Sequence, residues 1–258
     1  MGWAEAGPRA APKVHTSAQL SGPPVPEGLP FNPTFAPLFR LASYEYVPVQ
    51  QIYLLRHGQT DFNVQGIVQG SGVNSDLNAR GRRQAELFWE RYKDVPFDRI
   101  YTSQLKRTQQ SVQRFLDLGI PHDSLLALNE ISWGTREGTR ITPEEDAEYA
   151  RVLAEWLLGN DDARLPGGES PRQVADRQRA FIELYESRPD DEIVLVCMHG
   201  RAMRVLLCQL LGYPLRCMDG FEHHNLGLYK LHYNGARYTV RNFLDVSHLA
   251  EPPVTAEI

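Results

Sequence analysis

The order of apolar and polar positions from residue 50 onward alternates between two patterns. Short apolar runs, typical of buried strands, occupy residues 51–56, 98–102, 193–198, 226–232 and 237–243. Apolar residues spaced by three and four, typical of one buried helix face, occupy residues 79–92, 104–117, 143–158, 171–187 and 200–211. Strands that alternate with helices predict an α/β protein, a three-layer α/β/α sandwich with a mainly parallel central sheet.

Several local signals support these boundaries. Ser170 is expected to be an N-cap, with Pro171 at the first helical position and Gln173 completing a capping box. The segment Tyr233-Asn234-Gly235 predicts a hairpin between the last two strands. The pattern over 104–117 predicts one helix with a buried stripe made of Leu105, Thr108, Val112, Phe115 and Leu116.

Two of the predicted strands end abruptly on polar side chains. The apolar run Ile52 to Leu55 is followed by Arg56, His57 and a glycine, and the run at 193–198 is followed by His199. Burying such groups unpaired would be costly, so they must meet water, a structural anion or a substrate. Ligands of parallel sheets bind beyond the carboxyl ends of the strands, so this edge is the candidate site.

Two more polar residues fall at comparable points. Arg107 lies one turn inside the helix that follows the strand at 98–102, and Glu130 follows a short apolar segment. Taken singly, each residue has an ordinary explanation: a satisfied structural histidine, a solvated arginine or a capping carboxylate. Two histidines, two arginines and one carboxylate at a single edge favour a functional site.

Composition separates a domain from a leader. With 258 residues, 42% hydrophobic and 23% charged, the chain can bury a full core. Nine of the 18 prolines precede residue 50, which disfavours regular structure there. We expect a proline-rich leader at 1–48, flexible at least to about residue 30, with its aromatic part, 31–48, packed as a strap. A domain at 49–248 and a short tail at 249–258 follow.

The charge and the cysteines exclude several classes. A net charge of −5 argues against binding to nucleic acid or a membrane surface, although a local basic pocket remains possible. Cys197, Cys208 and Cys217 form neither a disulfide framework nor a metal site, so we expect a cytoplasmic protein. The longest apolar run, 193–198, is too short to span a bilayer. We find no metal-ligand spacing and expect no cofactor. The oligomeric state is left open.

Six segments, in order, carry a resemblance to a known family. They are RHGQTDFN (56–63), LNARGRRQA (77–85), SQLKRTQQS (103–111), NEISWGTREG (129–138), PGGES (166–170) and MHGR (198–201). The chain resembles the histidine phosphatase superfamily, the phosphoglycerate mutase-like group, over about residues 50–245. The resemblance implies the phosphoglycerate mutase-like fold. It also implies His57 as nucleophile and Glu130 as acid and base, with the phosphoryl oxygens held by Arg56, Arg107, His199 and Asn63.

The chemistry of phosphate ester hydrolysis also requires a nucleophile, fixed cations and a general acid. Hydrolysing a phosphate monoester requires lowering the barrier by on the order of 20 kcal/mol, and one general acid supplies only about 10²–10⁴-fold in rate. A covalent step and fixed cations around the phosphoryl group must provide the rest. Arginine suits this task because its planar fork binds two oxygens and stays charged. No metal is required.

The departures from the family pattern leave some roles open. In MHGR, Met198 and Arg201 replace small residues, and Arg201 is either a cation near the pocket or a solvated helix start. Arg136 and Arg140 could reach a second anionic group of the substrate, although solvated loop positions are the more common case.

Three functions are compatible with the resemblance: a phosphatase, a mutase and a non-enzymatic regulator. The length of the segment between Glu130 and Glu169, which would form a lid over the site, distinguishes a phosphatase from a mutase. Mutases of this family carry a long insertion after the acid-bearing loop, whereas only 39 positions separate Glu130 from Glu169 here. The short lid favours a metal-independent phosphatase that acts on a small phosphorylated metabolite. The alternative is a phosphoglycerate mutase-type phosphotransferase. A non-enzymatic regulator is disfavoured because the catalytic set is complete.

Overall fold

The computed structural model describes residues 49–140 and 146–250. The chain divides into two units, Met1–Glu45 and Tyr46–Ile258, and every described residue belongs to the second. The expected leader at 1–48, with its strap, lies outside the described residues, as do positions 251–258 of the expected tail. No helix among the described residues is long and apolar enough to cross a membrane.

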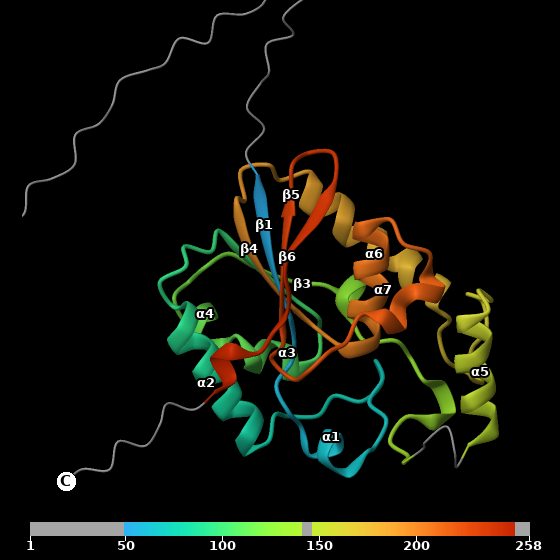
Figure 1. The fold of residues 1–258 in the computed structure, drawn as a ribbon. Helices are drawn as coiled ribbons and strands as arrows, with labels where there is room; N and C mark the ends of the chain where they lie inside the picture. Colours follow the sequence, from blue (N-terminus) through green and yellow to red (C-terminus); the bar gives the residue numbers. More distant parts are fainter. Residues whose placement is uncertain (1–48, 141–145, 251–258) are drawn as a thin grey trace, which may run out of the picture. The chain divides into compact units, whose positions relative to one another are not determined.

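The centre of the domain is a six-stranded sheet with the order β3-β2-β4-β1-β5-β6 (Figure 1). Its strands are β1 Gln50–Arg56, β2 Arg99–Thr102, β3 His122–Ser124, β4 Ile193–Met198, β5 Leu228–Tyr233 and β6 Tyr238–Asp245. The four strands β3, β2, β4 and β1 are mutually parallel, β5 pairs antiparallel with β1, and β6 pairs antiparallel with β5. The predicted α/β class and the mainly parallel sheet are confirmed.

Helices cover both faces of the sheet, because successive side chains of each strand point to opposite faces. On one face, Ile52 and Leu54 of β1 pack in a core with residues of α6 (Pro171–Glu186) and α7 (Gly200–Leu211). On the other face, Tyr53 and Leu55 pack with residues of α2 (Ala79–Tyr92) and α4 (Gln113–Leu116). Figure 1 shows these two layers on opposite sides of the sheet. β1 is therefore buried on both faces.

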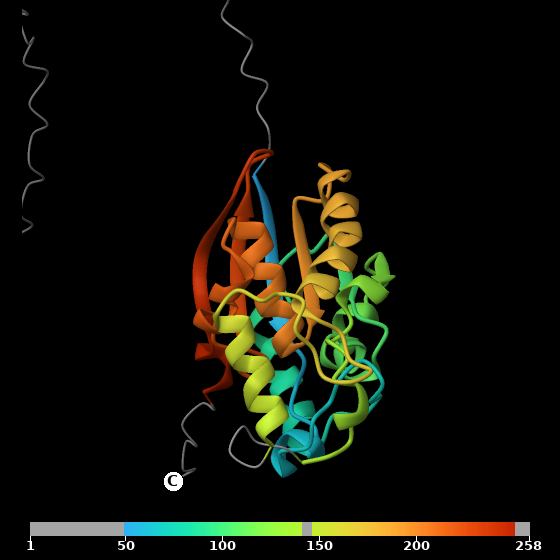
Figure 2. The ribbon, with the colours of Figure 1, turned by 90° about the vertical axis from the view of Figure 1, so that its right-hand side faces the viewer.

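The remaining elements are short, apart from one helix beside α7. They are α1 Asp61–Gln65, α3 Lys106–Ser111, α5 Ala147–Leu157 and the 3₁₀ turns η1 Leu126–Leu128, η2 Gly134–Arg136, η3 Leu215–Gly220 and η4 Ser247–Leu249. In Figure 2, α5 lies beside α7, and the Arg201 guanidinium rests 5.3 Å from the centre of the Trp156 ring. The helix expected at 143–158 is described from its Asp146 cap onward.

Most of the predicted boundaries hold, and one helix is corrected. The Ser170 capping box is present, and the Asn234 side chain accepts from two backbone N–H groups in the predicted hairpin. The helix expected at 104–117 is two helices, because Val112 leaves helical geometry with φ −121° and ψ 14°. The Ser111 hydroxyl donates to the Arg107 carbonyl at this break, a bond that competes with the helix ladder.

Candidate active site

The two predicted histidines meet at the carboxyl ends of β1 and β4. Arg56 pairs in register with Met198 on the neighbouring strand, so the residues that follow, His57 and His199, leave the sheet side by side. The His57 amide donates to the Met198 carbonyl at 2.9 Å, and the two imidazole rings lie 5.1 Å apart, centre to centre. Both side chains are buried.

The tautomer of His57 follows from its hydrogen bond. Nδ1 lies 2.8 Å from the Gly58 carbonyl oxygen, which can only accept, so Nδ1 carries the proton. Nε2 then keeps its lone pair. Burial, together with the charges of Arg107 and Arg56, lowers the pKa of His57 well below its usual value. The ring is therefore neutral at physiological pH and has a free nucleophilic nitrogen.

The backbone around His57 is fixed on several sides. The Asn225 amide donates to the His57 carbonyl at 2.9 Å, and the Gly58 amide donates to the Ser111 hydroxyl at 2.8 Å. Gly58 must lack a side chain, because a Cβ atom there would lie 2.8 Å from the Gly81 carbonyl oxygen. These contacts hold the backbone of His57 and Gly58 in one orientation.

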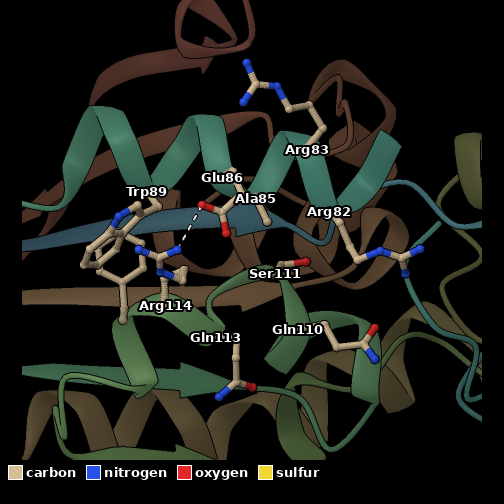
Figure 3. A pocket seen from close by; sticks show the side chains of 10 residues that line it. Arg82, Arg83, Ala85, Glu86, Trp89, Gln110, Ser111, Gln113 and Arg114 are labelled. Atoms are coloured by element: carbon tan, nitrogen blue, oxygen red, sulfur yellow. Dashed lines mark hydrogen bonds and ion pairs between the residues drawn. The ribbon is translucent and has the colours of Figure 1, made fainter. Parts of the chain in front are cut away.

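A separate hollow of about 400 Å³ lies between α2 and the α3–α4 segment (Figure 3). Trp89, Phe115 and the Arg82 and Arg114 side chains contribute to its walls, and none of the six candidate site residues lines it. It reaches Ser111, whose hydroxyl binds Gly58. The hollow therefore borders a residue that supports Gly58, next to His57, but it does not contain the candidate site.

The two predicted arginines have uncharged partners. Arg56 donates from Nη1 to Nδ1 of His223 at 3.1 Å, and its Nε is buried without a hydrogen-bond partner. Arg107, wholly buried, donates to Nδ1 of His199 at 3.2 Å and to the carbonyls of Val73 and Gly70. Burial lowers the pKa of each arginine to about 10, so both remain charged at neutral pH. Unpartnered donors on buried cations are what a phosphoryl group requires.

His199 has a protein partner on each ring nitrogen. Because a guanidinium only donates, Nδ1 accepts from Arg107, and Nε2 carries the proton and donates to the Ser103 hydroxyl at 2.8 Å. Burial and the Arg107 charge lower the pKa of His199 well below its usual value. A phosphoryl oxygen bound at Nε2 must share this donor with Ser103 or replace it.

The Glu130 side chain is linked to the site by hydrogen bonds to the N-terminus of helix α7. One carboxylate oxygen accepts from the amides of Ile131 and Ala202, at 2.9 and 2.8 Å, and the other accepts from the Arg201 amide at 3.1 Å. The side chain of His199, the N-cap residue, makes no capping bond, so Glu130 satisfies the orphan amides at this helix N-terminus. Arg177 stabilises the Glu130 backbone: its guanidinium donates to the Glu130 carbonyl and forms an ion pair with Glu169.

Asn63 contributes from α1. Its amide oxygen accepts from the Thr60 backbone at 3.1 Å and from the Asn225 side chain at 3.2 Å. The structure thus brings Arg56, His57, Arg107 and His199 into one network and ties Glu130 and Asn63 to it through α7 and Asn225.

Three residues of this network were not singled out in the sequence analysis. Ser103 binds His199, Asn225 binds the His57 carbonyl, and His223 binds Arg56. Ser103 opens the SQLKRTQQS segment, which could have pointed to it. His223 and Asn225 lie in the loop before β5, where no periodic pattern marks them.

The structure also shows the partners of the arginines whose roles were left open. Arg201 is mostly buried and shares one oxygen of Asp219 with Arg204, at 2.5 and 2.7 Å, so it is not a solvated helix start. Arg136 pairs with Asp146 at 2.9 Å and with Glu148 at 3.4 Å. Arg140 takes part in an isolated bridge with Ile67. In the described ranges, no cluster of three or more His, Cys, Asp or Glu residues could hold a metal ion.

Comparison with known proteins agrees with this geometry. Residues 52–246 match the histidine phosphatase superfamily (branch 1). A probable phosphoglycerate mutase GpmB from Salmonella choleraesuis is 30% identical over 212 residues, covering 78% of this chain and 96% of that protein.

Solved structures of similar proteins show the same fold. The α-ribazole phosphatase from Shigella flexneri superposes with a TM-score of 0.68 at 26% identity, covering 76% of this chain and 96% of that one. A mycobacterial glucosyl-3-phosphoglycerate phosphatase in complex with VO3 superposes with a TM-score of 0.65 at 26% identity, covering 75% and 98%.

The chain belongs to the histidine phosphatase superfamily, and it is an enzyme of the phosphoglycerate mutase-like phosphatase type.

Proposed function

We propose that the protein is a phosphomonoester hydrolase that acts on a small phosphorylated metabolite through a phosphohistidine at His57, without a metal ion. The observation that carries the proposal is the state of His57. Its ring is buried and neutral, Nδ1–H is held by the Gly58 carbonyl, and Nε2 keeps a lone pair near the buried Arg107 and the half-buried Arg56. A nucleophile of this kind needs no separate base, because it has no proton to lose.

In the first step, Nε2 of His57 attacks phosphorus, and the P–O bond to the leaving group breaks. The Arg56 and Arg107 guanidiniums stabilise the charge on the equatorial oxygens. Glu130, in its protonated form, gives its proton to the departing alkoxide. The Nδ1–H bond to Gly58 persists and supports the charge that the imidazole gains on becoming phosphorylated.

In the second step, water attacks phosphorus on the side that the leaving group has vacated, and the P–N bond breaks. Glu130, now ionised, accepts a proton from the water, and phosphate departs with His57 neutral again. The three backbone amides that donate to the Glu130 oxygens hold the carboxyl group in one orientation during both steps. One carboxyl group therefore serves both steps.

The partners of the arginines in and around the site favour hydrolysis over a mutase reaction. Arg56 and Arg107 face neutral acceptors, whereas Arg201 and Arg204 share Asp219, and Arg136 already binds Asp146. Of these five arginines, Arg56 and Arg107 are the two with uncharged hydrogen-bond partners, and they are the two assigned to the phosphoryl group, whose dianion their charge would balance. A mutase must in addition grip a second anionic group and exclude water while its intermediate turns over.

The second candidate is the mutase activity, favoured by the 30% identity to a probable phosphoglycerate mutase. The deciding experiment supplies 3-phosphoglycerate with a trace of 2,3-bisphosphoglycerate and follows 2-phosphoglycerate and free phosphate together. A panel of sugar phosphates, nucleotides and phosphopeptides, assayed in parallel, searches for the preferred substrate. We expect phosphate release to dominate. The hydrolase proposal is wrong if isomerisation of 3-phosphoglycerate is faster than phosphate release from it and from every member of the panel.

A further inference from the structure

The loop before β5 places His223 between Arg56, at the end of β1, and Gly200, at the start of α7. On one side, its Nδ1 accepts from the Arg56 guanidinium at 3.1 Å. On the other side, the ring packs against Gly200, the first residue of α7, where a Cβ atom would lie 2.6 Å from Nε2 and 2.9 Å from Cε1. The glycine after His199 is therefore required by the imidazole of His223.

The hydrogen bond fixes the protonation state of this ring. Because Arg56 can only donate, Nδ1 of His223 is unprotonated and the ring is neutral. The charged groups that face it from neighbouring elements are Arg56 from β1 and Arg201 and Arg204 from α7. Burial, followed by the Arg56 and Arg204 charges, lowers the pKa of His223 to about 3.

A neutral acceptor differs from the usual partner of a buried arginine. A carboxylate at this position would also orient Arg56, but it would cancel the charge that a phosphoryl group is meant to meet. An imidazole holds the guanidinium in place through its lone pair and adds no negative charge beside it. The Nε atom of Arg56 is buried and has no hydrogen-bond partner in the protein.

We propose that His223 is a positioning residue for phosphoryl binding, which orients Arg56 without placing a negative charge against its guanidinium. The inference rests on the proposed function, since Arg56 must bind the phosphoryl group for its orientation to matter. His223 itself is not assigned a contact with the substrate.

Four variants of the full-length protein separate orientation from charge. His223→Asn keeps an acceptor where Nδ1 now lies, His223→Ala removes it, and His223→Asp keeps it but adds a negative charge. His224→Ala, at the exposed neighbouring position, is the matched control. The readouts are the dissociation constant of inorganic phosphate, measured by calorimetry, together with kcat, KM and the melting temperature.

We expect phosphate to bind His223→Asn and His224→Ala within about threefold of the unmodified protein. Loss of one hydrogen bond to a charged group should weaken binding to His223→Ala by about ten- to a hundredfold. His223→Asp should bind phosphate at least as weakly as His223→Ala, although its carboxylate can pair with Arg56. Its pH profile should show the deficit shrinking toward acid pH, as the new carboxyl group is protonated.

Equal phosphate affinity in His223→Ala and the unmodified protein would overturn the proposal. So would equal losses in His223→Asn and His223→Ala, which would mean that ring shape alone matters, or tight phosphate binding by His223→Asp. If His223→Ala fails to fold, the comparison of His223→Asn with His223→Asp decides the outcome. Because phosphate binding needs no turnover, failure here is distinguishable from failure of the hydrolase proposal, which the unmodified protein tests by its product.

Discussion

Replacing Glu130 with Gln should slow the first chemical step in proportion to how much the leaving group needs a proton. With an alkyl phosphate the loss should be about 10²–10⁴-fold, the usual contribution of one general acid. With 4-nitrophenyl phosphate, whose leaving group is already a stable anion, it should be less than about tenfold. The amide cannot donate a proton to the leaving group, whereas the two neighbouring arginines are unchanged.

The structure also gives the stability cost of this substitution. The Glu130 oxygens accept from three backbone amides, of which the Gln oxygen can retain two, at Ile131 and Ala202. The Arg201 amide would then face an NH₂ group and lose its acceptor. An unsatisfied buried donor costs about 1–3 kcal/mol, which for a domain of this size lowers the melting temperature by roughly 2–12 °C.

The assay must isolate the first step, because Glu130 also activates the water in the second. Single-turnover release of alcohol or 4-nitrophenolate, by rapid quench or stopped flow, reports on the first step alone. Glu137→Gln is the matched control, since its carboxylate also accepts three bonds, from the Gly72 and Trp133 amides and the Ser132 hydroxyl. It should lose stability without any dependence on the leaving group. Equal losses on both substrates in Glu130→Gln would refute the acid role of Glu130.

Three further predictions follow from the site. His57→Ala should abolish phosphate release and the acid-labile phosphoprotein seen after rapid quench; retention of most activity would show that another residue is the nucleophile. Turnover should survive EDTA, and a loss restored by magnesium or zinc would contradict the metal-free mechanism. Burial lowers the pKa of His57, His199 and His223, so below a pH of roughly 6.5 the unfolded chain binds protons that the folded chain does not. The contribution of these histidines to the free energy of unfolding should therefore be constant above that pH and fall below it, by up to about 1.4 kcal/mol per pH unit for each histidine; equal free energies of unfolding from urea titrations at pH 7.5 and 5.5 would contradict this.

The sequence was informative wherever periodicity or capping chemistry operates locally. The paired signals at Ser170 and Gln173, and the apolar run that ends at Arg56, identified real boundaries in the structure. Val112 did not stand out, because the break after Ser111 depends on a hydroxyl that also binds Gly58, 53 positions away. The three-residue strand β3 was missed because it is short and polar.

The same reasoning applies to the site. Arg56, His57 and His199 could be assigned to one edge of the sheet because they end apolar strands, and Arg107 and Glu130 because they follow a strand and a short apolar segment and lie in family motifs. His223 could not, since its role depends on a loop folding back onto β1 from 167 positions away. The protonation states of the three imidazoles likewise emerge only from hydrogen-bond partners and burial, which no local pattern encodes.

The strand order has a consequence for how the enzyme matures during synthesis. β1, near the start of the described chain, pairs with β4 and β5, so its partners emerge from the ribosome well over a hundred residues later. Contacts of such long sequence separation form slowly and late. The apolar strand β1 therefore stays unpaired until β4 and β5 have been synthesised, and exposed apolar strands of this kind are prone to aggregate. A nascent chain that stops before His223 lacks both loop residues, His223 and Asn225, that contact Arg56 and His57 in the folded domain.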